Sequence, residues 1–121
     1  MRILLLSIVL LSFVASAHAE LTPPSEYIYS VRGIIKELPA GGSREISVRH
    51  EPIPNFVGFD GVVDPMPTMT MPFTLAEDVS LSGLSVGDEI EMRYEMRWKK
   101  PTRDVVTQIA KLPAGTVKFP K

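Results

Sequence analysis

The sequence contains no cysteine. This absence excludes disulfide bonds, zinc sites built from thiolates, iron–sulfur clusters, thiol nucleophiles and a lipidated N-terminal cysteine. It also leaves methionine and histidine as the protein ligands available to a soft metal ion. The chain has two histidines and one tryptophan, but six methionines. Any soft-metal chemistry must therefore use this small set of residues.

An excess of positive charge is also lacking, since 13 Lys+Arg face 14 Asp+Glu and the formal net charge is -1. A balanced chain has no basic surplus with which to neutralise a phosphate backbone or an anionic lipid surface. The few histidines and the absence of a matched acid–base pair leave little from which to build a catalytic site. We therefore expect a protein that is not an enzyme and binds no nucleic acid.

Residues 1–19 have the pattern of a cleaved secretory signal. Arg2 precedes an apolar run from Ile3 to Val14, and the segment ends on the small-x-small motif Ala17-His18-Ala19. The run is too short for a comfortable membrane span. The alternative, an anchor that stays attached, is disfavoured because no charged stop-transfer pattern follows. We expect an exported, periplasmic protein whose residues 20–121 form one domain, with a core at about 27–112 and no membrane span after cleavage.

Alternation of apolar and polar residues predicts five β-strands and no amphipathic helix. This pattern favours an all-β fold, and a small five-stranded OB-like β-barrel is the first choice. Pro72 is expected to place its strand at a sheet edge or at a bulge. The tail from Pro113 to Lys121 is expected to be peripheral. The expected strands are Tyr27–Ile35 and Glu45–His50, read as a hairpin, and Thr68–Leu75, Glu89–Trp98 and Arg103–Leu112.

A long loop from Glu51 to Pro67 separates the second and third expected strands. Its four prolines remove backbone donors and fix φ, which ends the strand pattern. Loops of this length are uncommon in compact domains and are usually functional or mobile. Its position beside the next segment is therefore of interest.

Methionine is concentrated in the segment that follows. Met66, Met69 and Met71 fall within six residues, and the last two project from the same side of a strand. A thioether is a soft, neutral donor, so a cluster of them selects Cu(I) or Ag(I) over Zn(II), Mg(II) or Ca(II). His50, on the strand face shared with Ile46 and Val48, is the natural nitrogen ligand beside them.

Each of these residues also has a structural interpretation. Met69 and Met71 could form the inner face of a barrel, because methionine fills gaps in cores. His50 taken alone is more often a hydrogen-bonded residue at a strand end. Met66 lies between two prolines and is harder to explain as core. The pattern alone leaves these alternatives open.

Three segments together resemble the CusF-like periplasmic copper-binding family: Ile46-Ser-Val-Arg-His50-Glu-Pro-Ile53, Met66-Pro-Thr-Met-Thr-Met-Pro-Phe73 and Leu84-Ser-Val-Gly-Asp88. The likeness covers roughly residues 31–112. It implies a small five-stranded OB-like barrel that binds Cu(I) or Ag(I).

Carried over position by position, the resemblance implies that His50, Met69 and Met71 are the metal ligands. The best-known members place a tryptophan just before the Met-Thr-Met segment, whereas this chain has Met66 there, a candidate fourth sulfur ligand. The loop is also longer, with residues 55–64 as an insertion. One interpretation of Trp98 is a replacement for the missing aromatic cap, but its alternation with Met92, Tyr94 and Met96 favours a core or rim position.

The resulting hypothesis is a monomeric periplasmic protein that sequesters Cu(I) or Ag(I) and hands the ion to an efflux or acceptor protein. Neutral thioether ligands suit such transfer, because no proton has to leave. The alternative is a secreted β-barrel interaction module with core methionines, no metal and the loop from Glu51 to Pro67 as its contact surface.

Overall fold

The computed structural model describes residues 27–99 and 104–120. The expected signal peptide, residues 1–19, lies outside the described residues.

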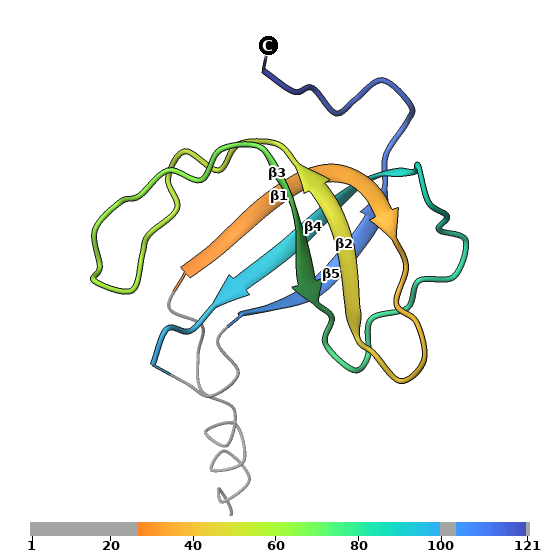
Figure 1. Ribbon diagram of the computed structural model, residues 1–121, viewed down its shortest axis with the longest axis horizontal. Helices are drawn as coiled ribbons and strands as arrows, with labels where there is room; N and C mark the ends of the chain where they lie inside the picture. The colour runs from red at the N-terminus through yellow and green to blue at the C-terminus, as the bar shows by residue number, and fades with distance from the viewer. Residues whose placement is uncertain (1–26, 100–103, 121) are drawn as a thin grey trace, which may run out of the picture.

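Five β-strands make up the described chain, as the alternating pattern predicts (Figure 1). The first strand continues two residues beyond its expected end, and the fourth ends two residues before Trp98. The strands are β1 (Tyr27–Glu37), β2 (Glu45–His50), β3 (Met69–Thr74), β4 (Glu89–Met96) and β5 (Asp104–Lys111).

The strands form one antiparallel sheet in the order β3-β2-β1-β4-β5. The expected hairpin of the first two strands is confirmed, and Pro72 lies on the edge strand β3 as expected. The two edges of the sheet approach each other just after β3. There, Leu75 and Val106 form a parallel bridge, and the N–H of Ala76 donates to the Val106 carbonyl at 2.9 Å. The all-β fold is confirmed, and the strongly curved sheet encloses the core.

Alternate residues of every strand point into this core. Met92 and Met96 are 1% and 4% exposed, which confirms that these two methionines are core residues. The rings of Phe73 and Tyr94 meet edge to face with centroids 5.0 Å apart, linking β3 to β4 across the interior. The inner faces of β2 and β3 therefore share one packed interior with β4.

Gly33 leaves room on β1 for the neighbouring backbone and side chains of β2. It pairs with His50 on β2, and a Cβ at this position would collide with the carbonyl oxygen of Arg49 and lie 2.6 Å from Cγ1 of Val48. Real Cβ atoms do not approach other atoms so closely. The residue type therefore sets the position of the end of β2, where His50 lies.

The C-terminal strap, residues 112–120, is not peripheral, so this expectation is wrong. The N–H groups of Gly115 and Val117 each donate to the Glu89 carboxylate at 2.6 Å, and the N–H of Lys118 donates to the Glu51 carboxylate at 2.7 Å. Val117 is only 9% exposed. The backbone hydrogen bonds lower the pKa of Glu89 below its ordinary value. Hydrogen bonds from backbone N–H groups to the side chains of Glu51 and Glu89 thus fasten the strap.

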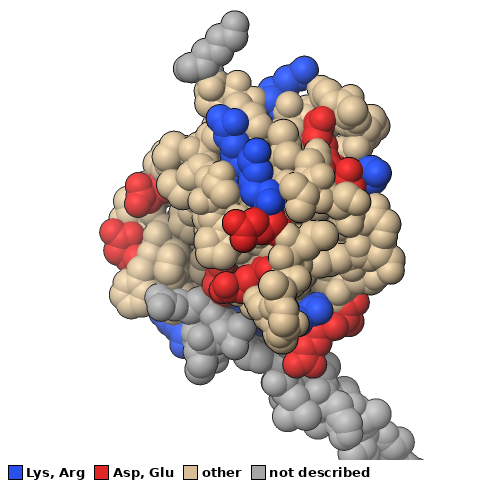
Figure 2. Space-filling view, turned by 45° about the vertical axis from the view of Figure 1, so that its right-hand side comes forward, with Lys and Arg blue, Asp and Glu red and all other residues tan. Residues whose placement is uncertain are grey.

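The surface mixes both signs of charge. Figure 2 shows Lys and Arg side chains beside Asp and Glu side chains, separated by uncharged surface, on the face in view. Across residues 27–99 and 104–120, no helix has the length and apolar character needed to cross a membrane.

Candidate metal centre

His50, the last residue of β2, points into the barrel and is 0% exposed. Its Nδ1 lies 2.7 Å from the backbone carbonyl oxygen of Glu51. Because a carbonyl oxygen can only accept, Nδ1 carries the proton and donates, which leaves the lone pair of the neutral imidazole on Nε2. Within the described part of the chain, Nε2 is buried and has no hydrogen-bond partner. The ring thus presents an unused nitrogen donor.

Met69 lies directly opposite His50 in the antiparallel ladder, and Met71 lies opposite Val48, the next inward residue of β2. The two methionines follow each other on the inner face of β3, ahead of Phe73. Phe73 is 0% exposed, Met71 is partly buried and Met69 is 42% exposed. The sheet therefore places the imidazole and both thioethers on one face, at the rim of the core where β2 ends and β3 begins.

The imidazole is also held by an aromatic contact. The rings of His50 and Phe73 meet edge to face at an interplanar angle of 85°, with centroids 5.9 Å apart. Packed against Phe73 and hydrogen-bonded through Nδ1, the ring has little freedom to rotate. A fixed ring is the usual condition of a histidine that binds a metal ion.

Met66 belongs to the segment that joins the two ligand-bearing strands, residues 51–68, which we call the β2–β3 arm. Its N–H donates to the carbonyl of Ile53 at 3.0 Å and its carbonyl accepts from the N–H of Ile53 at 2.8 Å. This bridge continues the ladder formed by His50 and Met69, three residues further along on each side. Met66 is partly buried against the core cluster. All four predicted ligands thus lie on one continuous hairpin.

Residues 55–64, the expected insertion, form the outer part of the arm, which extends away from the strands in Figure 1. Val57 and Val63 form a second bridge across it. Trp98 packs against this part of the arm: its Nε1 donates to the Val57 carbonyl at 2.9 Å, and its ring meets Phe56 and Phe59 edge to face, each with centroids 6.1 Å apart. Trp98 therefore occupies a rim position and supports the arm.

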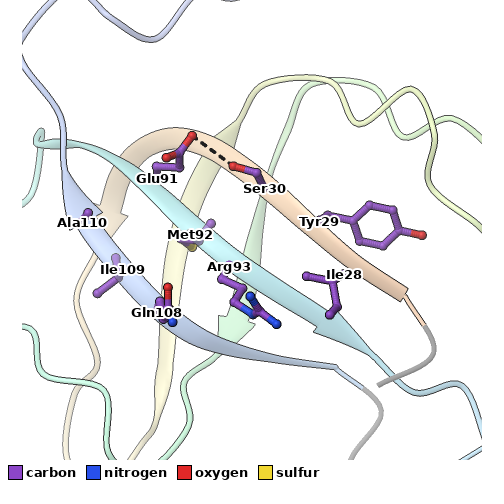
Figure 3. Close-up of a pocket in the computed structure, with 9 residues that line it drawn as sticks. All are labelled: Ile28, Tyr29, Ser30, Glu91, Met92, Arg93, Gln108, Ile109 and Ala110. Atoms are coloured by element: carbon purple, nitrogen blue, oxygen red, sulfur yellow. Dashed lines mark hydrogen bonds between the residues drawn. The ribbon is translucent and has the colours of Figure 1, made fainter. Parts of the chain in front are cut away.

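A hollow in the surface lies elsewhere on the molecule. It has a volume of about 500 Å³ and lies over β1, β4 and β5, where Ser30 donates to the Glu91 carboxylate at 3.0 Å and Arg93 lies nearby (Figure 3). None of the four predicted ligands lines this hollow. In the described part of the chain, no group of three or more His, Asp or Glu side chains is placed to hold a metal ion.

Sequence reasoning missed two features beside the predicted ligands. Glu51 fixes the tautomer of His50 through its backbone carbonyl, which no side-chain pattern reveals. The hydroxyl of Thr68, between Met66 and Met69, is buried without a hydrogen-bond partner in the described residues. Of these two features, the sequence gives a clue only to the first: Pro52 restricts the backbone of the preceding Glu51 to an extended conformation.

Residues 28–111 match the family described as "Copper binding periplasmic protein CusF". The chain belongs to the CusF family. The resemblance seen in the sequence is therefore confirmed. This is a periplasmic, copper-binding family whose members are metal-binding proteins rather than enzymes, in agreement with the expectation that the chain is not an enzyme.

Solved CusF structures have the same fold as this chain. A CusF–Ag(I) structure from Escherichia coli is 20% identical, with a TM-score of 0.55, and the match covers 76% of this chain and all of that one. An apo-CusF structure from Escherichia coli is 21% identical, with a TM-score of 0.54, and covers 76% of this chain and 99% of the other. A crystal structure of Ag(I)CusF gives 22% identity, a TM-score of 0.52 and coverages of 71% and 99%. These likenesses confirm the OB-like barrel. No curated protein matches the sequence.

Proposed function

We propose that this CusF-family protein binds Cu(I) or Ag(I) through Nε2 of His50 and the thioether sulfurs of Met69 and Met71, with Met66 as the fourth ligand. The observation that carries the proposal is the buried, unpartnered Nε2 directly opposite Met69. Leaving a buried nitrogen without a partner costs about 1–3 kcal/mol. Coordination of a metal ion offsets this cost.

The chemistry of the donors selects the ion. Thioether sulfur and imidazole nitrogen are neutral, soft or borderline donors, and a set rich in sulfur favours monovalent copper or silver over hard divalent ions. The absence of cysteine means that the site cannot be lost to disulfide formation in an oxidising compartment. The donor set therefore suits the periplasm, where the family is found.

The graded burial of the ligands supports a role in transfer as well as storage. His50 is 0% exposed, whereas Met69 is 42% exposed. A competing ligand from an acceptor protein can reach the ion from the side of Met69 and displace this neutral thioether without moving a proton. We infer that the protein sequesters the ion and hands it to an efflux or acceptor protein by ligand exchange.

The alternative of a metal-free interaction module with core methionines fits the structure less well. Met69 is too exposed for a core residue. If the methionines were only apolar packing residues, the buried Nε2 of His50 would also have no binding partner. A contact surface on the β2–β3 arm is compatible with metal binding. It does not require the methionines to be core residues.

Export by cleavage after Ala19 is part of the proposal. The support comes from the signal-like sequence of residues 1–19 and from the periplasmic character of the family. N-terminal sequencing of the protein recovered from the periplasm should begin at Glu20. A protein that retains residues 1–19 and sediments with membranes would instead establish the attached anchor.

The proposed site is tested by anaerobic titration with Cu(I) against a chromophoric chelator. The unmodified protein should remove one equivalent of Cu(I) from the chelator. His50→Ala should abolish this competition. Met66→Leu distinguishes the coordination number, because it weakens binding only if Met66 is a ligand.

Met92→Leu is the matched control, since it replaces a thioether that lies in the core, at 1% exposure. It should leave the Cu(I) affinity unchanged. Circular dichroism of each variant separates loss of a ligand from loss of the fold. Failure of the unmodified protein to compete with the chelator would overturn the proposal.

A further inference from the structure

Glu51 connects three parts of the molecule. Its N–H donates to the carbonyl of Arg32 on β1 at 2.7 Å, and its own carbonyl accepts from Nδ1 of His50 at 2.7 Å. Its carboxylate accepts from Nε and Nη2 of Arg32 at 3.0 and 3.2 Å and from the N–H of Lys118 at 2.7 Å. The side chain is only 16% exposed. Backbone and side chain are thus both fixed.

The C-terminal strap holds both residues that flank His50 in the sequence. Lys118 binds the Glu51 carboxylate, and the ring of Phe119 lies under the Arg49 guanidinium, 4.1 Å from ring centroid to guanidinium carbon. Because side chains alternate along a strand, Arg49 is on the outer face of β2 while His50 is on the inner face. Figure 1 shows the strap at the end of the barrel where β2 ends. The strap therefore contacts the outer side of the same segment whose inner side carries the imidazole of His50.

The strap lies outside the part of the chain that matches the family model. The match to the CusF family ends at residue 111, and the strap begins at residue 112. Its contacts with Glu51 and Glu89 are made by backbone N–H groups, so they depend on the course of the chain rather than on particular side chains. The strap thus contacts, from outside the core, the two residues that flank His50.

We propose that Glu51 is a positioning residue through which the C-terminal strap fixes the orientation and tautomer of His50. The N–H of Lys118 and the fork of Arg32 hold the Glu51 side chain, and Pro52 restricts the Glu51 backbone to extended conformations. With side chain and backbone both held, the Glu51 carbonyl points at Nδ1 of His50. The proton then stays on Nδ1, and the lone pair of Nε2 faces the thioethers.

The positioning role of Glu51 rests on the proposed metal function, but the tautomer of His50 can be measured in the metal-free protein. Nitrogen-15 NMR of the imidazole distinguishes a proton on Nδ1 from one on Nε2, and at about pH 8 an ordinary imidazole is neutral. The chain has a second histidine, so a His18→Gln background leaves one imidazole signal. In the metal-free protein we expect His50 to be almost wholly in the Nδ1–H form.

Two variants break the connection at different points. Lys118→Pro removes the N–H that reaches Glu51, together with the lysine side chain, and fixes φ at this position. Lys118→Ala is its matched control, because it loses the same exposed side chain and keeps the N–H. Glu51→Gln replaces one carboxylate oxygen by an NH2 group, which cannot accept, so a single oxygen is left for the three N–H donors of Arg32 and Lys118. We expect Lys118→Pro and Glu51→Gln to populate the Nε2–H tautomer, and Lys118→Ala to leave the signal unchanged.

Metal affinity provides the second readout. Loss of a partner that orients a histidine ligand typically costs 10- to 100-fold in affinity, so Lys118→Pro should weaken Ag(I) binding by about 10-fold. The double variant Lys118→Pro/Glu51→Gln should bind Ag(I) no more weakly than Glu51→Gln alone, because Lys118 acts through Glu51. If the losses of Ag(I) affinity in the two single variants add up in the double variant, Lys118 does not act through Glu51, and the proposal is overturned.

The tautomer measurement also tests the positioning role of Glu51 independently of the proposed metal-binding function. An unchanged Nδ1–H signal in both Lys118→Pro and Glu51→Gln would overturn the positioning role even if the protein binds Ag(I). A shifted tautomer in a protein that binds no Cu(I) or Ag(I) would instead refute the metal function and uphold the connection. If Glu51→Gln does not fold, Lys118→Pro, at the end of the chain, still decides the question.

Discussion

His50 and Met69 face each other across the β2–β3 ladder, yet the first is 0% exposed and the second is 42% exposed. The nitrogen donor is fixed in the interior by Glu51 and Phe73, whereas the sulfur donor opposite it is open to solvent. This asymmetry predicts an order of ligand exchange, in which the thioether of Met69 leaves the ion before the imidazole does.

Replacing Met69 by Leu should therefore separate binding from stability. The two side chains have similar volume, and such apolar exchanges usually cost less than about 1.5 kcal/mol even in a core. Loss of a ligand should weaken Ag(I) binding by at least the 10- to 100-fold that loss of an outer partner of a ligand causes. Chelator competition measures the affinity, and thermal unfolding of the metal-free protein measures the stability.

The exchange kinetics give a second check on Met69. With the unmodified protein, the rate of Ag(I) transfer should rise with the concentration of a thioether competitor, since the incoming ligand attacks from the exposed side. A rate that is independent of competitor concentration would mean that the ion dissociates first, which contradicts attack at an open thioether.

Trp98 should support the arm without acting on the metal ion. Its indole N–H bonds to Val57 and its ring packs against Phe56 and Phe59. Trp98→Phe keeps the aromatic packing and loses the hydrogen bond, so stability should fall by about 1 kcal/mol. The Ag(I) affinity should stay within about twofold, because an indole ring at the rim supplies no donor atom to the metal ion. A larger loss than that of Met66→Leu would assign Trp98 to the metal site.

The fold and the four candidate ligands could be predicted because each depends on a local pattern. Period-2 alternation identified all five strands, and the spacing of Met69 and Met71 placed both on one face of a strand. The end of β4 was misplaced because Trp98 continues the alternation, although it lies at the rim of the core and packs against Phe56 and Phe59 of the arm rather than inside the core. Periodicity alone cannot distinguish these two environments.

The strap could not be predicted for a different physical reason. Its principal contacts are backbone N–H groups of Gly115, Val117 and Lys118 on two carboxylates, and every residue except proline carries such a donor. In the sequence, Glu51 is only the first residue of the long loop, and Glu89 is one of the polar residues that alternate with the apolar residues of its strand. The lowered pKa of Glu89 is visible only once the strap is in place.

Gly33→Ala should destabilise the barrel at the position where the metal centre is built. The added methyl group would lie 2.6 Å from Cγ1 of Val48 and 2.9 Å from Cα of His50 and would collide with the carbonyl of Arg49. Backbone atoms cannot move aside cheaply, so we expect a loss of about 1–3 kcal/mol or more. Urea unfolding measures the loss, and Gly42→Ala is the matched control, because nothing lies within 4 Å of its Cβ position.

Alkaline pH should destabilise the protein through Tyr94. Burial, together with the hydrogen bond that its hydroxyl donates to Asp104 at 2.8 Å, raises the pKa of Tyr94 well above its ordinary value of 10.0. Below pH 10 both the folded and the unfolded protein hold this proton, so Tyr94 adds no pH dependence. Above it only the folded protein does, and the free energy of unfolding should fall by up to about 1.4 kcal/mol per pH unit.

Tyr94→Phe isolates this effect from the other groups that titrate in the same range. At neutral pH the variant should be less stable by about 1 kcal/mol, because Asp104 loses its hydrogen-bond donor. Above pH 10 the variant has no phenol to ionise on unfolding, so its stability should fall less steeply. Urea unfolding of both proteins between about pH 7 and pH 11.5 should show the two stability curves converging. Parallel curves would mean that Tyr94 ionises equally readily in the folded and unfolded protein, contrary to its burial against Phe73 in the core.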